Sequence, residues 1–326
     1  MRRRTFLSAS LGSMAGVSGC AAPSTRVHSG AALAFGTTIS VTLLHDDAGV
    51  AQAAIEAALA EARLVDRLMS IHDPASEVAG LNRDGVLDRP HAHLLAVLRQ
   101  AQWLSALTRG AFDITVQPLW QSFRAAADLG QLPGAPQRRR VRAQVGWRRV
   151  LIDDAQVRLA GKHMAITLNG LAQGYAADLA LAALRARGID HALLDTGEFA
   201  ARGRNAAQQA WTIGVADPRD VASMAAVVGI DGRCLATSGD YAAAFSADFV
   251  HHHIFDPATG ASPTELASVS VVAPTATLAD GLSTACMVLG AKKSHALAAT
   301  LPKVDLMTIN KRGVVWRSPG FPLAAG

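Results

Sequence analysis

Three oxygen-bearing side chains stand close together near the end of the chain. Asp280, Ser283 and Thr284 occupy positions i, i+3 and i+4 of a stretch rich in alanine, leucine and methionine, a composition that favours a helix. This spacing places the three side chains on one face of the helix. Carboxylate and hydroxyl oxygens suit magnesium or calcium better than zinc. The sequence therefore predicts a site for a hard divalent cation.

Asp280 has an alternative role in capping that helix. Thr277 and Asp280 have the spacing of a capping box, in which the two side chains satisfy backbone amides of the first turn. The two roles are compatible, and the sequence leaves both open. Because protein side chains rarely supply a complete magnesium shell, we expect a pyrophosphate ligand to complete it.

A run of three histidines, His251 to His253, is the second unusual feature. Zinc is a weak hypothesis here, because no further cysteine or histidine stands at the compact spacing typical of zinc ligands. A histidine that accepts a proton is a better one. A solvated turn before Asp256 and Pro257 is the alternative without chemistry.

Two further segments combine glycine with polar residues. Residues 167–178 are expected to form a strand end, a glycine turn and a helix start, where free backbone amides attract phosphate. Tight packing of a helix on a sheet explains the same glycines. Residues 110–116 form either an ordinary strand entry or an acidic corner that faces the sugar or ring of a ligand. Ser238 lies in no G-x-S-x-G motif, so a serine hydrolase is disfavoured.

The first twenty residues predict export. Arg3 and Arg4 precede a short apolar stretch that ends at Cys20, and this stretch is too short to span a bilayer. The arginine pair resembles a twin-arginine signal, and the small residues before Cys20 resemble a lipobox, in which that cysteine is acylated. We expect a periplasmic protein, anchored to the membrane through Cys20. Ordinary cleavage near Ala21 is the alternative.

Composition and charge narrow the classes of protein to which the chain could belong. The chain has 326 residues, of which 50% are hydrophobic and 17% charged, so a globular protein is expected. Removal of residues 1–19 lowers the formal charge from +5 to +2, because three arginines and no acidic residues are lost. The arginines of residues 138–149 are therefore expected to form a solvated face and not a nucleic-acid site. Cys234 and Cys286 are expected to be buried, not paired.

The order of expected elements favours an α+β fold over a doubly wound sheet. Helices are expected at residues 48–69, 93–107 and 174–188, with a turn at Asn82 and Gly85 and a surface excursion at 128–144. Strands are expected at residues 35–44, 149–159, 164–168, 193–195, 211–215 and 267–272. The predicted organisation is a signal (1–20), a tether (21–34) and one domain (35–326).

Five motifs in order resemble those of the ApbE family, the FAD:protein FMN transferases. They are GAFDITVQPLW at 110–120, LNGLAQGYAAD at 168–178, ATSGDY at 236–241, HHIFDPATG at 252–260 and ADGLSTACMVLG at 279–290. The resemblance runs from about Phe35 to Gly290 and covers most of the mature chain.

The resemblance implies an α+β fold of two related halves with the flavin site between them. It also implies that magnesium holds the FAD pyrophosphate while a threonine hydroxyl of an acceptor flavoprotein attacks the FMN phosphorus and AMP leaves. His253 matches the family histidine that deprotonates this threonine. The implied metal ligands are Asp280, Ser283 or Thr284, and a carbonyl near Gly170. The implied flavin contacts are Phe35, His72, Ala111, Phe112, Asp113, Thr167, Gln173, Ile254 and Phe255.

The chain departs from the common family pattern at four positions. Gln173 stands where lysine or glutamate is common, Phe35 where methionine is usual and His72 where tyrosine is usual, while Glu198 interrupts a glycine pair. The Gln173 variant resembles the NosX-like subgroup, whose acceptor would be a membrane respiratory flavoprotein such as a NosR-like protein. Two other functions stay open: a magnesium-dependent FAD pyrophosphatase, and a lipoprotein that binds FAD without chemistry.

Overall fold

The computed structural model describes residues 26–324. The predicted signal (1–20), with Cys20, and the first part of the predicted tether (21–25) lie outside the described residues. No helix within residues 26–324 is both long enough and apolar enough to cross a membrane.

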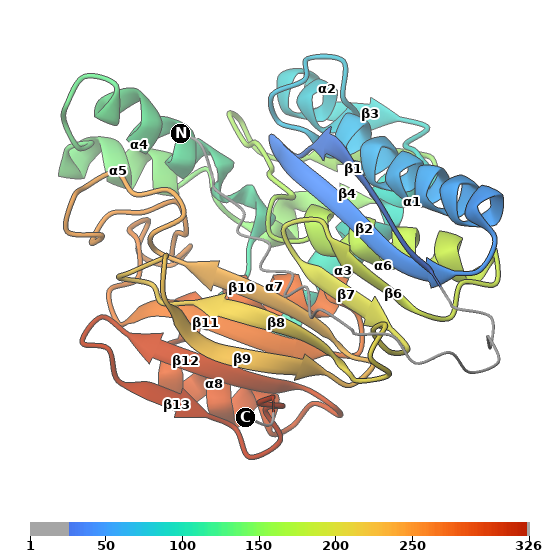
Figure 1. Cartoon of the computed structure of the whole chain (residues 1–326). Helices are drawn as coiled ribbons and strands as arrows, with labels where there is room; N and C mark the ends of the chain where they lie inside the picture. Colours follow the sequence, from blue (N-terminus) through green and yellow to red (C-terminus); the bar gives the residue numbers. More distant parts are fainter. Residues whose placement is uncertain (1–25, 325–326) are drawn as a thin grey trace, which may run out of the picture.

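An eight-stranded sheet runs through the protein in the order β1-β2-β6-β7-β10-β11-β12-β13 (Figure 1). Every neighbouring pair in it is antiparallel. Its strands are β1 (Arg26–Ala34), β2 (Thr37–His45), β6 (Ala192–Asp195), β7 (Phe199–Arg202), β10 (Cys234–Gly239), β11 (Leu266–Ala273), β12 (Asp305–Asn310) and β13 (Val315–Arg317).

Strand β1 corrects the predicted tether. Residues Arg26–Ala34 pair with β2 along their whole length and form an edge of the sheet. Two of the apolar residues of β1, Ala32 and Ala34, are buried against the core. The outward face carries the exposed Val27 and Leu33, so the segment lacks the alternation of buried apolar and exposed polar residues that signals a half-buried strand.

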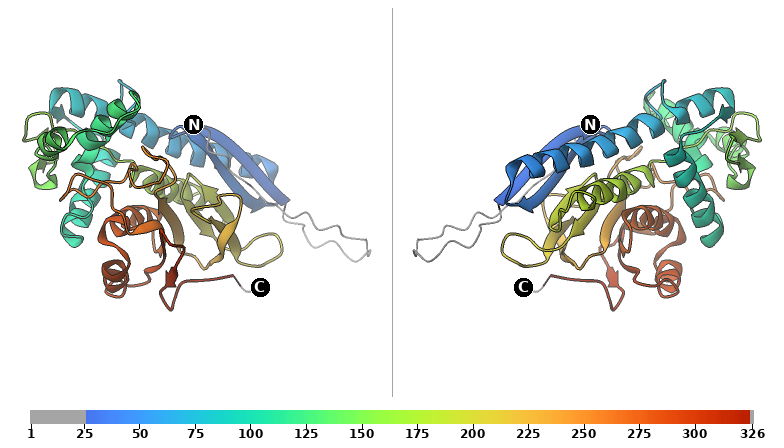
Figure 2. Two further views of the ribbon diagram at one scale, coloured as in Figure 1. Left: turned by 90° about the vertical axis from the view of Figure 1, so that its left-hand side faces the viewer. Right: turned by 90° about the vertical axis from the view of Figure 1, so that its right-hand side faces the viewer.

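Helices cover one face of the sheet and a two-stranded ribbon covers the other (Figure 2). Helices α1 and α6 pack on each other and on the first strands, while α7 packs on β10 and β11. The ribbon of β8 (Trp211–Ala216) and β9 (Met224–Ile230) forms a second core with the opposite face. The covering helices are α1 (Ala48–Met69), α6 (Ala172–Arg185), α7 (Ala276–Leu289) and α8 (Ala291–Ala298).

The remaining elements lie between β2 and β6 in the chain. They are α2 (Glu77–Asp84), β3 (Val86–Asp88), α3 (Ala92–Leu107), α4 (Gln117–Ala127), α5 (Ala135–Arg142), β4 (Val150–Ile152) and β5 (Gln156–Leu159), with short 3-10 turns at Ile114–Val116 and Trp147–Arg149. Strands β3, β5 and β4 form a small antiparallel sheet.

Several sequence predictions about these elements differ from the structure. Asn82 lies inside α2, and only Gly85, with φ 74°, ends that helix. The expected strand at 164–168 is an irregular buried segment, and the expected surface excursion at 128–144 contains α5. The α+β fold class is confirmed, as are the expected helices at 48–69 and 93–107, within one residue.

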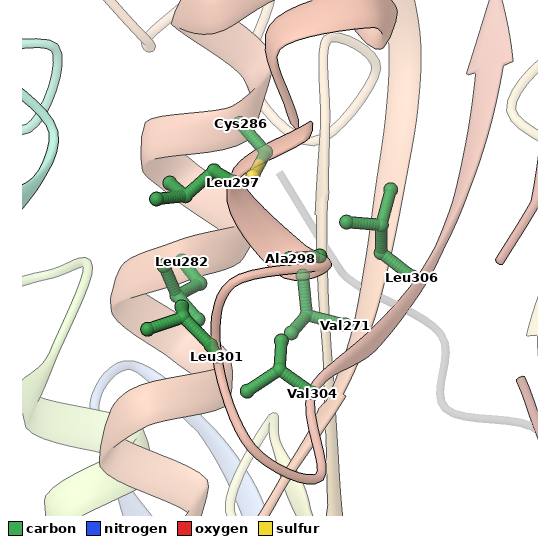
Figure 3. A pocket seen from close by; sticks show the side chains of 8 residues that line it. All are labelled: Val271, Leu282, Cys286, Leu297, Ala298, Leu301, Val304 and Leu306. Atoms are coloured by element: carbon green, nitrogen blue, oxygen red, sulfur yellow. The ribbon is translucent and has the colours of Figure 1, made fainter. Parts of the chain in front are cut away.

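The two sides of α7 serve different purposes. Leu282 and Cys286 line a small apolar pocket closed by α8, β11 and β12 (Figure 3). Burial raises the pKa of the Cys286 thiol to about 11, as expected for a cysteine that packs as an apolar residue. Asp280 is two residues before Leu282, so it lies on nearly the opposite side of the helix.

Candidate metal and flavin site

Helix α7 begins at a cap provided largely by another helix. Asp178 of α6 accepts hydrogen bonds from the amides of Ala276 (2.8 Å) and Thr277 (2.9 Å), and Thr275 accepts one from Leu278. The predicted capping box is wrong, because the Thr277 hydroxyl instead donates to Asp178. Asp280 therefore has no role in capping its own helix.

Asp280 is a buried carboxylate at the contact between α6 and α7. Only 3% of its surface is exposed, and its Oδ2 accepts a hydrogen bond from the Gly174 amide at 3.1 Å. Burial raises the pKa of Asp280 to about 7, and the negative charge of Asp178 adds to the shift. A cation at this position would favour the ionised carboxylate.

Hydroxyl and carbonyl groups stand around the next turn of α7. The Ser238 hydroxyl of β10 lies 2.8 Å from that of Ser283 and 3.2 Å from that of Thr284. A Cβ atom placed on Gly170 would lie 2.9 Å from Thr284 Oγ1, so the backbone of Gly170 also borders this group. We call Gly170, Ser238, Asp280, Ser283 and Thr284 the oxygen cluster.

The oxygen cluster fits a hard cation. It offers one carboxylate, three hydroxyls and the nearby backbone of Gly170, the donor types preferred by magnesium. Within residues 26–324, no group of three or more histidine, cysteine, aspartate or glutamate side chains is placed to hold a metal ion. Ser238 was not among the predicted ligands, although it lies in the ATSGDY motif; only the pairing of β10 with β11, under α7, reveals its position.

Gln173 and Gly174 open α6 beside the cluster. The side-chain amide of Gln173 donates to the backbone carbonyl of Thr196 at 2.6 Å. The Thr196 hydroxyl donates back to the backbone carbonyl of Gln173 at 2.9 Å. A Cβ atom on Gly174 would lie 2.4 Å from the carbonyl oxygen of Ala276. This glycine is thus required for the close approach of two helices, whereas the sequence alternative was packing of a helix on a sheet.

The GAFDITV motif joins the cluster through Phe112. The ring of Phe112 is 3.4 Å from the position of a Cβ on Gly170, and the amide of Thr167 donates to the carbonyl of Ile114 at 2.8 Å. The structure therefore brings Phe112 and Thr167, two predicted flavin contacts, close to Gly170, a predicted metal ligand. Ala111, next to Phe112, is half-buried.

The Asp113 carboxylate points into the protein. Its Oδ1 accepts from the amide and hydroxyl of Thr115 at 2.8 and 2.6 Å, and its Oδ2 accepts from the Trp147 amide at 3.0 Å. Burial raises the pKa of Asp113, against the effect of these hydrogen bonds. In this arrangement the acidic corner holds the backbone of residues 146–147 in place.

Two predicted flavin contacts lie on other elements. Phe35 occupies the turn between β1 and β2, with φ 55°, and packs on the main core. His72 is exposed after α1, with its ring 6.3 Å from the ring of Trp120 on α4. Phe35 thus contacts the main core, and His72 contacts α4.

The three histidines belong to a long loop, residues 241–262, which we call the histidine loop. His252 is fully buried; its Nε2 donates to the carbonyl of Pro263 at 3.0 Å and its amide donates to Ser262. Burial lowers the pKa of His252 to about 4, so the ring is neutral near pH 7. His253 is only half-buried, and its amide donates to the carbonyl of Ala243 at 2.9 Å.

The residues after His253 anchor the histidine loop in two cores. Ile254 packs in the main core, whereas Phe255 packs with Leu119 and Phe123 of α4. The same loop follows directly from β10, so that Ser238 of the oxygen cluster and Ala243 are five residues apart. Five residues span at most about 17 Å, so Ala243, which accepts the hydrogen bond of the His253 amide, lies within about that distance of Ser238.

A buried carboxylate with two cationic partners fixes the other side of the histidine loop. Asp240 is completely buried and accepts two hydrogen bonds from Arg219, at 2.8 and 2.9 Å. Lys311 lies 3.2 Å from the same carboxylate and also donates to the carbonyl of Phe249. The Arg219 guanidinium stacks over the Phe249 ring at 4.8 Å. Sequence reasoning missed this group because its members are separated by up to 92 positions in the chain.

A buried carboxylate with hydroxyls next to a helix start offers donor types that suit a hard cation and a phosphate group. Comparison with known proteins identifies the family. Residues 35–308 match the model of the ApbE family. The chain is 31% identical to the FAD:protein FMN transferase of Treponema pallidum, over 87% of this chain and 84% of that protein. It is also 31% identical to the protein of the same description from Haemophilus influenzae, over 84% of both.

Solved structures agree with this result. The ApbE protein of Thermotoga maritima superimposes with a TM-score of 0.81 at 27% identity, over 90% of this chain and 97% of that one. The flavinyl transferase ApbE of Pseudomonas stutzeri gives a TM-score of 0.78 at 27% identity, over 90% and 95%. The chain belongs to the ApbE family.

Proposed function

We propose that this protein transfers the FMN part of FAD to a threonine hydroxyl of an acceptor flavoprotein, in a magnesium-dependent reaction that releases AMP. Flavin transfer is supported by the family membership and by relatives described as FAD:protein FMN transferases. The observation that carries the magnesium and phosphate chemistry is the buried Asp280 carboxylate within the oxygen cluster. We further propose that the flavin lies between two related α+β halves of the fold.

Each part of the oxygen cluster has a role in this reaction. Asp280, the hydroxyls of Ser283 and Thr284 and the carbonyl of Gly170 would hold the cation. When bound, magnesium would neutralise the diphosphate of FAD and the charge that develops on the leaving AMP. Ser238 keeps the two hydroxyls of α7 in position by its hydrogen bonds at 2.8 and 3.2 Å.

His253 is the proposed proton acceptor. The threonine oxygen forms a bond to the FMN phosphorus as the phosphoanhydride bond to AMP breaks, and the hydroxyl proton passes to the imidazole. A neutral imidazole is suited to this task near pH 7. The half-buried position of His253 leaves part of its surface open to an acceptor, whereas the neighbouring His252 is fully enclosed.

The acceptor assay tests this proposal. Mature protein is incubated with FAD, magnesium and an acceptor fragment, and the fragment is weighed by intact-mass spectrometry while AMP is followed by chromatography. We expect the mass of one FMN phosphoester on the threonine, no gain on a fragment with valine in its place, and strong loss with His253→Ala. Release of AMP without acceptor would indicate a pyrophosphatase, and neither product would indicate a protein that only binds FAD.

Location and acceptor are further parts of the proposal. We propose export to the periplasm by the twin-arginine signal and a lipid anchor at Cys20, which mass spectrometry of the mature N-terminus would test. A membrane respiratory flavoprotein such as a NosR-like protein is the acceptor to try first.

A further inference from the structure

A run of arginines without nearby acidic residues borders the histidine loop. No aspartate or glutamate occurs from Leu129 to Ile152. Of the two acidic residues that flank this stretch, Asp128 already pairs with Arg124 at 3.1 Å. Within residues 26–324, none of the six arginines is joined to a carboxylate in an ion pair. We call them the arginine segment: Arg138, Arg139, Arg140, Arg142, Arg148 and Arg149.

Four of the six arginines are exposed, Arg138 and Arg149 are half-buried, and the backbone that carries them is held in place. Helix α5 has no buried residue, and Arg139, Arg140, Arg142 and Arg148 are all exposed. Just after α5, the amide of Gly146 donates to Thr115 at 2.7 Å and that of Trp147 donates to Asp113 at 3.0 Å. The GAFDITV motif thus fixes the backbone on which the positive charges stand.

Contacts place the arginine segment against the histidine loop. Val141 and Val145 pack on the core that contains Phe255, and a Cβ atom on Gly260 would lie 3.2 Å from Cβ of Arg142. Arg138 is one turn before Arg142, on the same face of α5. Burial is the largest cause that lowers the pKa of His251; the Asp248 charge raises this pKa and the Arg138 charge lowers it, so both charges lie near the ring. Figure 1 shows α4 and α5 beside this orange loop, far from β1 and β2.

We propose that the arginine segment is the docking surface for an acidic stretch of the acceptor protein, next to its target threonine. The inference rests on the proposed function, because it needs a protein substrate. Arginine binds carboxylates with two parallel hydrogen bonds, and unpaired guanidinium groups steer a negatively charged partner from a distance. An acidic stretch bound at Arg138 and Arg142 would bring a neighbouring hydroxyl to the loop that carries His253. This closeness favours a protein partner over an anionic membrane surface.

Direct binding tests the surface separately from catalysis. Fluorescence anisotropy with a labelled acceptor fragment measures the dissociation constant at low and high ionic strength, for wild type and for Arg138→Gln/Arg142→Gln. Arg185→Gln/Arg187→Gln is the matched control, because it removes the same charge from exposed positions at the far end of α6. We expect binding at low ionic strength to weaken about tenfold in the first variant only, with a flatter salt dependence. The KM for FAD should stay unchanged.

Charge reversal sharpens the test. Arg138→Glu/Arg142→Glu should bind the native fragment poorly and regain affinity for a fragment whose acidic residues near the threonine are changed to lysine. Equal weakening by the α5 variant and the α6 control would overturn the proposal, since net charge alone would then explain the effect. Binding to anionic phosphatidylserine vesicles is measured alongside, with phosphatidylcholine vesicles as the neutral control. If the α5 variants bound the fragment normally but lost binding to the anionic vesicles, the proposal would be overturned in favour of a membrane surface. Absence of flavin transfer by a wild type that binds the fragment would instead refute the proposed function.

Discussion

The contact between α6 and α7 and the histidine loop are built in different ways. At the first, the buried carboxylate of Asp280 and the half-buried one of Asp178 accept hydrogen bonds from backbone amides of the opposite helix. At the second, an irregular loop is held by the ion pairs of the buried Asp240 and by a neutral histidine, and an exposed, basic helix borders it. We call the contact between α6 and α7 the rigid part. Under the proposed function, the rigid part binds the diphosphate of FAD, and the histidine loop contacts the acceptor protein.

Asp280→Asn should have the largest effect on activity, and this effect should come from the rigid part alone. Asparagine keeps an oxygen for the Gly174 amide but removes the charge that would bind the cation. Since a metal ion contributes several kcal/mol to transition-state stabilisation, we expect loss of magnesium-dependent AMP release by about 100-fold or more. The measurement is the rate of AMP release with and without magnesium, and normal rates would show that the cluster is not the metal site.

The same variant should gain stability without metal. The folded-state pKa of Asp280, about 7, is above its ordinary value of 3.8, so its contribution to stability is lost as pH rises from about 4 through 7. At pH 8 the metal-free wild type therefore holds a costly buried charge that asparagine lacks. Thermal unfolding should show a higher Tm for Asp280→Asn in chelator, and added magnesium should raise the Tm of the wild type only.

Gly174→Ala should break the contact between the two helices. The new Cβ would lie 2.4 Å from the Ala276 carbonyl oxygen and 2.8 Å from Cβ of Asp280, both fixed parts of α7. Overpacking of this kind costs about 1–3 kcal/mol, so we expect a lower free energy of unfolding and weaker magnesium binding. Gly80→Ala in α2 is the control, because its nearest neighbour is the tip of the flexible Arg83 side chain at 3.7 Å. An undiminished magnesium affinity in Gly174→Ala would separate the helix contact from the metal site.

Lys311→Met should weaken the histidine loop and spare the rigid part. Methionine keeps the length of the side chain but removes the charge beside Asp240 and the donor to the Phe249 carbonyl. Arg219 still pairs with Asp240, so we expect a moderate loss, about 1–2 kcal/mol of stability. Acceptor-dependent transfer should slow while the magnesium dependence of FAD binding stays the same. Lys292→Met, at an exposed position of α8, should change neither property.

Local sequence signals predicted single helices better than the contacts between distant segments. Helix α1 could be bounded from the sequence because its apolar spacing ends at Met69 and Asp47 caps its start within three residues. The cap of α7 could not, because Asp178 provides it from 98 positions away. Residues 164–168 have the composition of a strand, yet they form none. The Thr167 amide donates a hydrogen bond to the Ile114 carbonyl. The composition of a segment can indicate that it is buried. It does not indicate which distant segment it will pair with, because that depends on the whole fold.

The pH dependence of stability should reveal the smallest effect, at His252. The pKa of His252 in the folded protein, about 4, is below its ordinary value of 6.5. Its contribution to stability is therefore complete above pH 6.5 and is lost as pH falls from about 6.5 through 4. Between about pH 7 and pH 5.5 the wild type should lose about 1 kcal/mol that His252→Gln does not lose. Because the raised pKa of Asp280 acts in the opposite direction over this range, the test is the difference between the two denaturant-unfolding curves at each pH. Parallel losses in both proteins would mean that His252 is protonated in the folded loop, and that the hydrogen bond to Pro263 does not require the neutral ring.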